Sequence, residues 1–346
     1  MKISDELSFK VKNMSLLCAA FVVTIHILLP GGRESSTWFA SQFIVKGLAQ
    51  IAVPFFFLVS GYFLAAHIGE DNWWRKALSK RFFSLVIPFF IWSFISTVVV
   101  IPLNVCADLI AHRPFGTSIY LLHGVEWCRF FGIDMTDYPE LVPLWYVRCL
   151  FIFVIASPVV AFCLSKLGWL WLFVCFVASI LCCHISNPAL YNLFCRGISA
   201  DGLFYFSAGI FIRGQTKLSD TTFAAITSLI VGIGFLSLKI VLFYNSFGWQ
   251  GDIGKLSVPF LLYAIWHWMP AVRLPRWLAD CSFPIFLMHV LFFPYLTMAL
   301  KSLHVEDNGL MHSLLRFAVG FVGSIVVANL MRMSFPKISK ALFGGR

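Results

Sequence analysis

Long stretches without charge are the feature that most restricts the fold of this chain. Ten segments between charged residues are candidate membrane spans of 11 to 29 residues: 13–32, 47–69, 82–107, 149–165, 167–195, 202–212, 221–238, 256–272, 281–300 and 317–331. A helix needs about 20 mostly apolar residues to cross the hydrocarbon core of a bilayer. The pattern therefore predicts an all-α membrane protein, a polytopic bundle of about ten transmembrane helices.

The composition excludes other classes of protein. Of the 346 residues, 60% are hydrophobic and 12% are charged, whereas a soluble domain carries about 25% charged residues. These values exclude a soluble enzyme, a disordered chain and a secreted disulfide scaffold. No run of basic residues is long enough to bind nucleic acid, and no linker or repeat divides the chain. We expect a single membrane domain over residues 1–346.

Two of the ten stretches are short for a span. We expect the helix around 202–212 to begin upstream, near Ile198, with Asp201 inside it or at its mouth. The last helix is expected to begin near His312, with Arg316 at its outer end, because a long cationic side chain can reach the membrane surface from such a position.

The distribution of positive charge predicts the orientation. With ten spans and a cytoplasmic N-terminus, the cytoplasmic loops and tails hold 16 of the 26 basic residues: Lys2, Lys10, Lys12, Arg75, Lys76, Lys80, Arg81, Lys166, Arg213, Lys217, Arg273, Arg276, Arg332, Lys337, Lys340 and Arg346. Cytoplasmic loops are enriched in Lys and Arg, so both termini are predicted to be cytoplasmic. One long loop, about 104–142, then lies on the outer face. Cys106 and Cys128 are both in it and could form a disulfide there.

His26 is the first residue that could carry chemistry. It follows the apolar run at the predicted outer end of the first span. An imidazole can act as a general base near neutral pH. The alternative is an interfacial histidine that only bonds a loop carbonyl, and the residue types alone favour neither.

Three polar residues mark the second and third spans. Ser60 precedes Gly61 in an aromatic run; it either bonds a ligand or, more commonly, its own backbone, while Gly61 is expected to allow close helix packing. Lys80 and Arg81 begin the third span at the predicted cytoplasmic surface. They either bind the phosphates of a cytosolic donor or anchor the span in its orientation, which is the commoner role.

The start of the fourth span carries Trp145, Tyr146 and Arg148. The two aromatic residues are typical of an interfacial belt. Arg148 is predicted on the same side of the membrane as His26, where it either orients an acidic or sugar acceptor or simply extends to the surface.

His289 lies deep in the ninth span and must find a hydrogen-bond partner there. Asp201 and Lys239 are the other deep polar groups, which pair with each other or face the interior. His67, His112, His123, His304 and His312 are expected in or near loops and solvated, and His184 and His267 lie near the ends of spans without an assigned role. No CxxC pair, Walker loop, GxSxG elbow or HExxH pair occurs, so we expect no metal site and no bound cofactor.

Five segments in order resemble the acyltransferase 3 family of integral membrane O-acyltransferases. They are Leu17 to His26, Val53 to Tyr62, Lys80 to Phe90, Leu144 to Tyr146 and Ser282 to His289. The first ends on the family's first-helix histidine, the second is similar to its Phe-rich Ser-Gly-Tyr run, and the others are similar to its third, fourth and late helices. The resemblance covers nearly the whole chain and implies ten membrane helices.

The resemblance also implies an activity. It is O-acyl transfer, usually acetyl, from cytoplasmic acetyl-CoA or another acyl-CoA to a sugar hydroxyl of an envelope glycan or lipid-linked saccharide, with His26 as base or acyl relay. Two positions depart from the family pattern: Ser15 stands where an arginine is common, with Lys12 one turn earlier as a substitute, and Ser84 replaces a second arginine after Arg81.

Other functions remain open from the sequence. The chain is also compatible with a transporter or flippase for a lipid-linked sugar or small metabolite, or with a catalytically inactive family member. The expected site residues are His26 for catalysis and Lys12, Ser60, Lys80, Arg81, Trp145, Arg148 and His289 for donor or substrate. We expect a multi-pass protein of the cell (inner) membrane, with assembly as a homo-oligomer possible, whose partners are acyl-CoA, the glycan acceptor and the bilayer.

Overall fold

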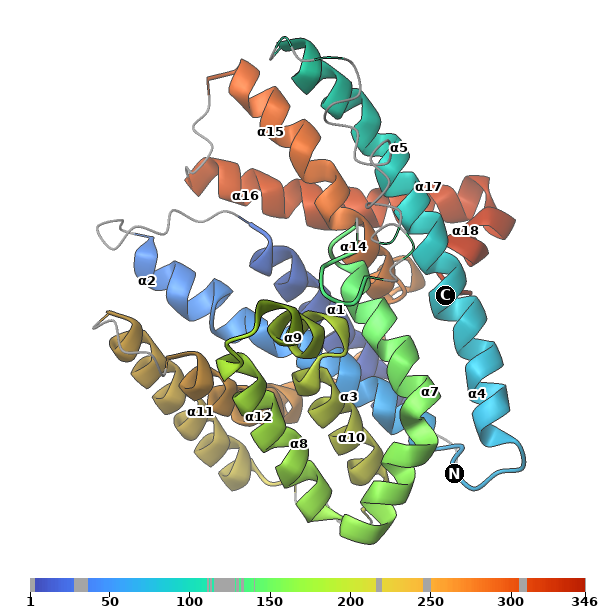
Figure 1. Cartoon of the computed structure of the whole chain (residues 1–346), viewed down its shortest axis with the longest axis vertical. Coiled ribbons are helices and arrows are strands. Elements are labelled where there is room, and N and C mark those ends of the chain that lie inside the picture. The colour runs from blue at the N-terminus through green and yellow to red at the C-terminus, as the bar shows by residue number, and fades with distance from the viewer. Residues whose placement is uncertain are drawn as a thin grey trace.

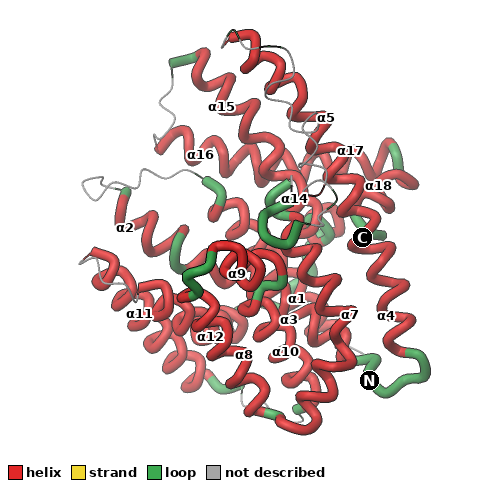
Figure 2. Tube along the Cα trace, viewed as in Figure 1, coloured by secondary structure: helices red, strands yellow, loops and turns green. Residues whose placement is uncertain are grey.

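The described part of the chain is helical throughout (Figures 1 and 2). The structure is a computed structural model that describes residues 4–27, 37–110, 112, 114, 128, 131, 134–139, 141–215, 220–244, 250–304 and 310–345. No strand occurs in these residues, which confirms the predicted all-α class.

The α-helices range from three to 24 residues in length. In chain order they are α1 (Asp5–Ile25), α2 (Trp38–Ala40), α3 (Ala52–Ala65), α4 (Trp73–Arg81), α5 (Ile87–Ile110), α7 (Leu144–Leu167), α8 (Trp169–Leu181), α9 (Pro188–Asn192), α10 (Ala200–Gly214), α11 (Thr222–Tyr244), α12 (Gln250–Trp268), α13 (Arg276–Ala279), α14 (Ser282–Met288), α15 (Phe292–Ser302), α16 (Leu310–Ala318), α17 (Ser324–Ser334) and α18 (Pro336–Leu342). Wider π-helical turns join several of them, at Ser41–Val45, Phe82–Val86, Leu193–Gly197 and Val319–Gly323.

Seven helical segments in the described residues are long and apolar enough to cross a membrane. They are Asp5–Ile25, Trp38–Ala65, Trp73–Cys106, Leu144–Leu167, Thr222–Tyr244, Ser282–Ser302 and Leu310–Ser334. The other three predicted spans fall on α8, α10 and α12, which are helical but have 13, 15 and 19 residues. The first two are short, and α12 carries Asp252 and Lys255. A multi-pass membrane protein is confirmed, while the count of ten and the orientation stay predictions.

The outer surface of the bundle is apolar. Phe94, Phe162, Phe173 and Phe223 have more than half of their side-chain surface exposed. A water-soluble protein rarely exposes so much contiguous apolar surface, whereas the acyl chains of lipids solvate it without cost. The exposed aromatic and aliphatic side chains therefore belong to the lipid-facing surface.

Local sequence explains where two of the helices begin and end. Ser4 caps α1, because its Oγ accepts the backbone N–H of Leu7 at 3.2 Å, and Asp5 and Glu6 in the first turn favour the positive end of the helix dipole. Gly168 alone separates α7 from α8, with φ of 52°. That backbone conformation suits glycine and lets the chain reverse between two helices.

A close seam joins α3 and α10 in the centre of the bundle. A Cβ atom on Gly61 would overlap the carbonyl oxygen of Phe206, and one on Gly209 would overlap that of Leu58. The prediction of close packing at Gly61 is confirmed. Aromatic rings fill the space beside the seam, with Phe57 4.6 Å from Tyr146, measured between ring centroids.

The helices are arranged around this centre (Figure 1). Helices α4 and α5 run as one long rod along one edge, and α11 and α12 pack together along the opposite edge. Helix α15 reaches the same end of the molecule as the far end of α5, and α16 crosses below it (Figure 1). The core therefore sits where α1, α3, α7, α10 and α14 meet.

Two expectations about the ends of helices need correction. Helix α5 continues to Ile110, so the loop predicted from about 104 begins later; most of that loop lies outside the described residues. Cys106 and Cys128 are both free thiols.

The last helix begins at Leu310 as predicted, but His312 is fully buried rather than solvated. Arg316 donates to its Nε2 at 3.2 Å, which accounts for its burial.

Candidate functional site

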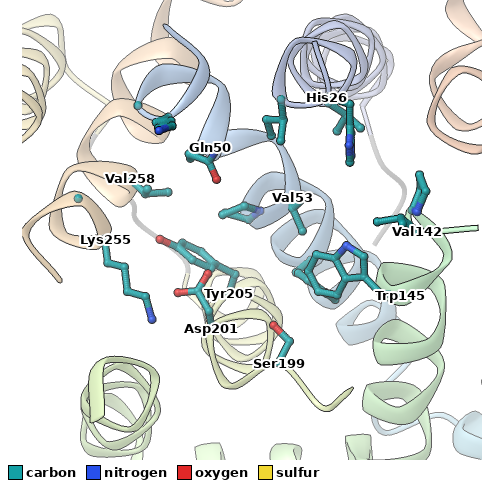
Figure 3. A pocket seen from close by; sticks show the side chains of 18 of the residues that line it. His26, Gln50, Val53, Val142, Trp145, Ser199, Asp201, Tyr205, Lys255 and Val258 are labelled. Carbon is teal, nitrogen blue, oxygen red and sulfur yellow. The ribbon is translucent and has the colours of Figure 1, made fainter. Parts of the chain in front are cut away.

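A cavity of about 560 Å³ opens at the His26 end of α1 (Figure 3). Its walls come from seven parts of the chain, on different helices and turns. The lining residues are Val22, Ile25, His26, Lys46, Gly47, Gln50, Val53, Pro54, Phe57, Tyr138, Val142, Pro143, Trp145, Ser199, Asp201, Tyr205, Lys239, Gly254, Lys255, Val258 and Phe286. The volume suits a small organic molecule or one sugar unit.

His26 directly follows the last residue of α1. The helix ends at Ile25, and the backbone N–H of His26 donates to the Val23 carbonyl at 3.0 Å. Its imidazole is on one side of the cavity, above Trp145 (Figure 3). The predicted catalytic residue therefore lies in the wall of this cavity.

The ring of His289 lies next to that of His26. The two imidazole centroids are 5.1 Å apart, with their planes tilted by 49°. His289 Nδ1 is 2.8 Å from the Ile285 carbonyl oxygen. A carbonyl can only accept, so Nδ1 carries the proton and Nε2 is the acceptor in the neutral ring. Nε2 is buried and has no hydrogen-bond partner. The predicted need of His289 for a partner is confirmed, and one acceptor nitrogen remains available beside His26.

A carboxylate faces the cavity from the opposite side. Ser199 caps α10 by accepting the Gly202 N–H at 3.0 Å, and this cap places Asp201 in the first turn of the helix. Asp201, Tyr205 and Lys255 lie together across the cavity from His26 (Figure 3). Asp201 and Lys255 are near enough to interact electrostatically. The expected position of Asp201, in the first turn of its helix, is confirmed.

Two further lysines and an amide line the same cavity. Lys239 Nζ donates to the Lys46 carbonyl, so Lys239 bonds to backbone, and Asp201 interacts electrostatically with Lys255 instead. Gln50 Nε2 donates to the Val45 carbonyl at 2.9 Å, which leaves its oxygen toward the cavity (Figure 3). The π-helical turn Ser41–Val45 directly precedes Lys46 and aligns this wall.

Aromatic rings form a third wall. Trp145, predicted as a substrate residue, lines the cavity and lies 6.3 Å from Phe57 between ring centroids. Tyr138 lines it as well, with the guanidinium of Arg196 4.7 Å above its ring. Flat aromatic faces beside hydrogen-bonding groups are suited to hold a sugar ring.

Arg148 does not line the cavity. Its guanidinium donates to three backbone carbonyls, those of Asp134 at 2.7 Å, Asp137 at 3.0 Å and Arg196 at 3.3 Å. The side chain is 8% exposed. Arg148 therefore fastens residues 134–137 to the turn before α10, and it supports the cavity wall that contains Tyr138.

The predicted donor residues of the second and third spans meet at Tyr146. The Ser60 Oγ lies 3.4 Å from the Tyr146 hydroxyl oxygen, and Arg81 interacts electrostatically with Tyr146. Lys80 is exposed. The Tyr146 ring packs against Phe57 and Phe286, both of which line the cavity. Ser60 and Arg81 are therefore one aromatic layer away from the cavity, and Lys80 is outside it.

Lys12 lies at the opposite end of α1 from His26. Its Nζ is 2.8 Å from Asp280 Oδ1. It lines a second cavity, of about 330 Å³, together with Asp5, Phe9, Asn13, Val272, Arg273, Leu274, Arg276 and Ala279. Fourteen residues separate Lys12 from His26 along α1, or about 21 Å.

Several lining residues were not singled out from the sequence. Lys46 and Lys255 served only as the boundaries of uncharged stretches, although a lysine at the edge of a span can also face an interior cavity. Gln50, Ser199 and Tyr205 gave no signal, because their importance comes from the pairing of helices distant in sequence. No group of three metal-ligating side chains occurs within the described ranges.

The comparisons with known proteins bear on the family. The family model described as acyltransferase domain, of the acyltransferase 3 family, matches residues 14–333, nearly the whole chain. No curated protein and no solved structure shows a detectable match. The matched range contains His26, His289 and every residue that lines the larger cavity. On this match the chain belongs to the acyltransferase 3 family, a family of membrane acyltransferases.

Proposed function

We propose that the protein is an O-acyltransferase that moves an acyl group, acetyl in the simplest case, from cytoplasmic acyl-CoA to a hydroxyl of a cell-surface or envelope glycan. The observation that carries the proposal is the His26 imidazole in the wall of the 560 Å³ cavity, backed by the free Nε2 of His289. The family provides the reaction class.

The reaction needs one base and produces one ester. The acceptor hydroxyl oxygen attacks the thioester carbonyl carbon while His26 takes the hydroxyl proton. The tetrahedral intermediate then collapses, the carbon–sulfur bond breaks and the thiolate of CoA leaves. His26 returns the proton to the sulfur, so the products are the acyl ester and free CoA. A positioned general base contributes about 10²–10⁴-fold to such a rate.

His289 is proposed as the residue that orients His26. Its Nδ1–H is held by the Ile285 carbonyl, so only Nε2 can accept from a neighbour. If His26 donates one ring N–H to this nitrogen, its other nitrogen is left without a proton and can receive one from the acceptor hydroxyl. The ring centroids are 5.1 Å apart, so a small movement of the His26 ring would form that bond.

The far side of the cavity has the chemistry of a sugar site. Asp201, Gln50 and Ser199 offer hydrogen-bond acceptors to hydroxyl groups, and Trp145 offers an aromatic face. The lysines at positions 46, 239 and 255 favour a saccharide that carries negative charge or phosphate. We therefore expect the acceptor to be an acidic or phosphate-linked glycan.

The donor is proposed to approach from the other side of the aromatic layer. Arg81 lies inside the long span Trp73–Cys106 and interacts with Tyr146, whose ring packs against the cavity residues Phe57 and Phe286. A guanidinium binds phosphate well. On this proposal Arg81, Lys80 and Lys12 attract the phosphates of acyl-CoA, and the protein works in the cell (inner) membrane.

The decisive test is transfer of radiolabelled acetyl from acetyl-CoA to envelope glycans. Membranes contain the wild type, His26→Ala or the control His67→Ala, at expression matched by immunoblot. His67 is an exposed histidine that pairs with Glu70 at 3.2 Å, so its loss is the same chemical change away from the cavity. We expect label in glycan with the wild type and His67→Ala, and at least a hundredfold less with His26→Ala.

Two results would contradict the proposal. If His26→Ala transfers label as fast as the control, His26 is structural. If no membrane transfers label but a labelled lipid-linked sugar changes sides in a manner that depends on the protein, the protein moves its substrate without modifying it.

A further inference from the structure

Apart from Lys12, no residue of the smaller cavity, at the Lys12 end of α1, has been given a role above. Its 330 Å³ is the volume of about ten water molecules. It lies between the first turns of α1 and the segment that leads into α13. Its charged lining residues are three cations, Lys12, Arg273 and Arg276, and one carboxylate, Asp5.

Asn13 provides an unpartnered acceptor in this cavity. Its Nδ2 donates to the carbonyls of Pro270 at 2.7 Å and Val272 at 2.9 Å. Because carbonyls only accept, these two bonds fix the orientation of the amide and direct nitrogen, not oxygen, toward them. Oδ1 is buried without any hydrogen-bond partner, and the side chain is only 9% exposed. A buried acceptor left unpaired is destabilising, and a bound donor would remove that cost.

The charges in the cavity are only partly used within the protein. Lys12 bonds to Asp280, which is outside the lining. No ion pair joins Asp5 to Arg273 or Arg276 in the described ranges of the chain. Arg273, Arg276 and Asp5 are exposed at the rim of the cavity. The two guanidinium groups are therefore accessible to an anion, and Asp5 is accessible to a hydrogen-bond donor.

The surroundings place the cavity at the level of a membrane surface. Val272 and Trp277, which flank the two arginines, are 59% and 57% exposed. Exposed tryptophan beside arginine is typical of the boundary between lipid tails and headgroups. Basic pockets between membrane helices at that boundary bind phosphate headgroups.

We propose that this cavity binds a phosphate group that carries a nearby amino donor: Arg273 and Arg276 hold the phosphate, while Asn13 Oδ1 and Asp5 accept from the amine. Two sources have this chemistry. One is a phospholipid with an ethanolamine headgroup, and the other is the adenine nucleotide half of CoA, with its exocyclic amine. Only the nucleotide source rests on the acyl-transfer function proposed above.

The test measures binding and does not depend on catalysis. The purified full-length protein is exchanged into micelles with phosphatidylethanolamine, phosphatidylcholine or phosphatidylglycerol, and bound lipid is counted by native mass spectrometry. Binding of radiolabelled CoA is measured in parallel. Arg273→Gln/Arg276→Gln is compared with the wild type and with Arg75→Gln/Lys76→Gln, which removes two exposed cations from α4.

Each outcome decides between sources or against the site. Phosphatidylcholine has the same phosphate but no N–H to donate, so a lipid site is expected to prefer phosphatidylethanolamine. The occupancy of phosphatidylethanolamine is expected to be roughly tenfold lower in the Arg273→Gln/Arg276→Gln variant. A loss confined to CoA binding supports the nucleotide source. If neither ligand binds less tightly to the double variant than to the control variant, the proposal is wrong.

A second variant keeps the test valid if the double variant does not fold. Asp5 is exposed in the first turn of α1, so Asp5→Asn removes a charge without disturbing the core. We expect it to lower the occupancy of phosphatidylethanolamine several-fold and to leave phosphatidylglycerol, which has no amine, unchanged. An equal effect on both lipids would overturn the assignment of the amine contact.

Discussion

The two ends of α1 carry polar groups in opposite ways. At the Lys12 end the ion pair with Asp280 joins side chains that are 45% and 35% exposed. At the His26 end, His289 is fully buried and bonds a backbone carbonyl, and Arg148 bonds three more. Exposed charged groups attract ligands but are screened and flexible, whereas groups held by backbone keep the fixed geometry that catalysis requires. The difference predicts which substitutions change binding and which change structure or rate.

The strongest test of this contrast is Arg148→Ala. Two charged hydrogen bonds of 3.0 Å or less disappear, each worth about 1.5–3 kcal/mol, so we expect a loss of at least about 3 kcal/mol. The loss is measured as a lower midpoint of thermal unfolding in detergent, which is monitored by size-exclusion chromatography of heated samples. Arg148→Lys should lose nearly as much, since one ammonium cannot reproduce the planar fork.

The matched control for Arg148 is Arg75→Ala, an exposed arginine on α4. Its unfolding midpoint should equal that of the wild type. If Arg148→Ala also unfolds like the wild type but binds acceptor less tightly, Arg148 contacts the acceptor, as the sequence first suggested, and the contrast between the two ends of α1 weakens.

The next prediction concerns the seam that sets the width of the larger cavity. Helices α3 and α10 provide Val53, Phe57, Asp201 and Tyr205 to its walls. In Gly61→Ala the new methyl group meets the backbone of α10, and such overpacking costs about 1–3 kcal/mol. The unfolding midpoint should fall, and acyl transfer should fall with it because the walls move apart.

Gly234→Ala is the control for that substitution, because no atom lies within 4 Å of the added Cβ on α11. It should be neutral or slightly stabilising, since alanine favours the helix. Equal behaviour of the two variants would mean that the α3–α10 seam is looser than the contact between Gly61 and Phe206 indicates.

The sequence predicted the positions of the helices better than the residues of the cavity. Uncharged stretches mark where a helix can cross the membrane, so even short α10 was expected at its correct place around Asp201, although the stretches do not give the ends of the helices. His312 was assigned to solvent because its burial comes from the packing of α16 against α15, where Thr297 lies 3.4 Å from its Nε2, and no local pattern shows that contact.

Arg148 illustrates the same limit at the site. Its charge and position suggested a ligand, but its partners are backbone carbonyls of residues 134, 137 and 196. Every residue type has a carbonyl, so such a partner leaves no trace in the sequence. His26 and His289 could be selected because an imidazole in an apolar run is costly wherever it lies, whereas Gln50 or Ser199 at a helix end is not.

The third prediction separates orientation from structure at His289. His289→Asn keeps a donor for the Ile285 carbonyl but has no atom at the position of Nε2, while His289→Gln offers an acceptor oxygen near that position. If Nε2 orients His26, we expect kcat for acetyl transfer to fall roughly tenfold in Asn and to recover in part in Gln. KM for the acceptor should stay unchanged, because the far wall of the cavity is untouched.

The unfolding midpoints of these two variants are the control for His289. They should match each other, because both side chains are polar amides in the same buried space. If kcat in the two variants follows their stability rather than the presence of an acceptor, His289 is a packing residue.

The smallest effect is expected for Lys12→Ala. An ion pair between side chains as exposed as Lys12 and Asp280 contributes about 0–1 kcal/mol, and less at high salt, so the unfolding midpoint should hardly change. Comparing Lys12→Ala, Asp280→Asn and the double variant isolates the pair itself. If the coupling exceeds about 2 kcal/mol, the Lys12 end is as rigid as the His26 end. A KM for acyl-CoA that rises while kcat stays constant would instead place Lys12 in donor binding, with the chemistry confined to the His26 end.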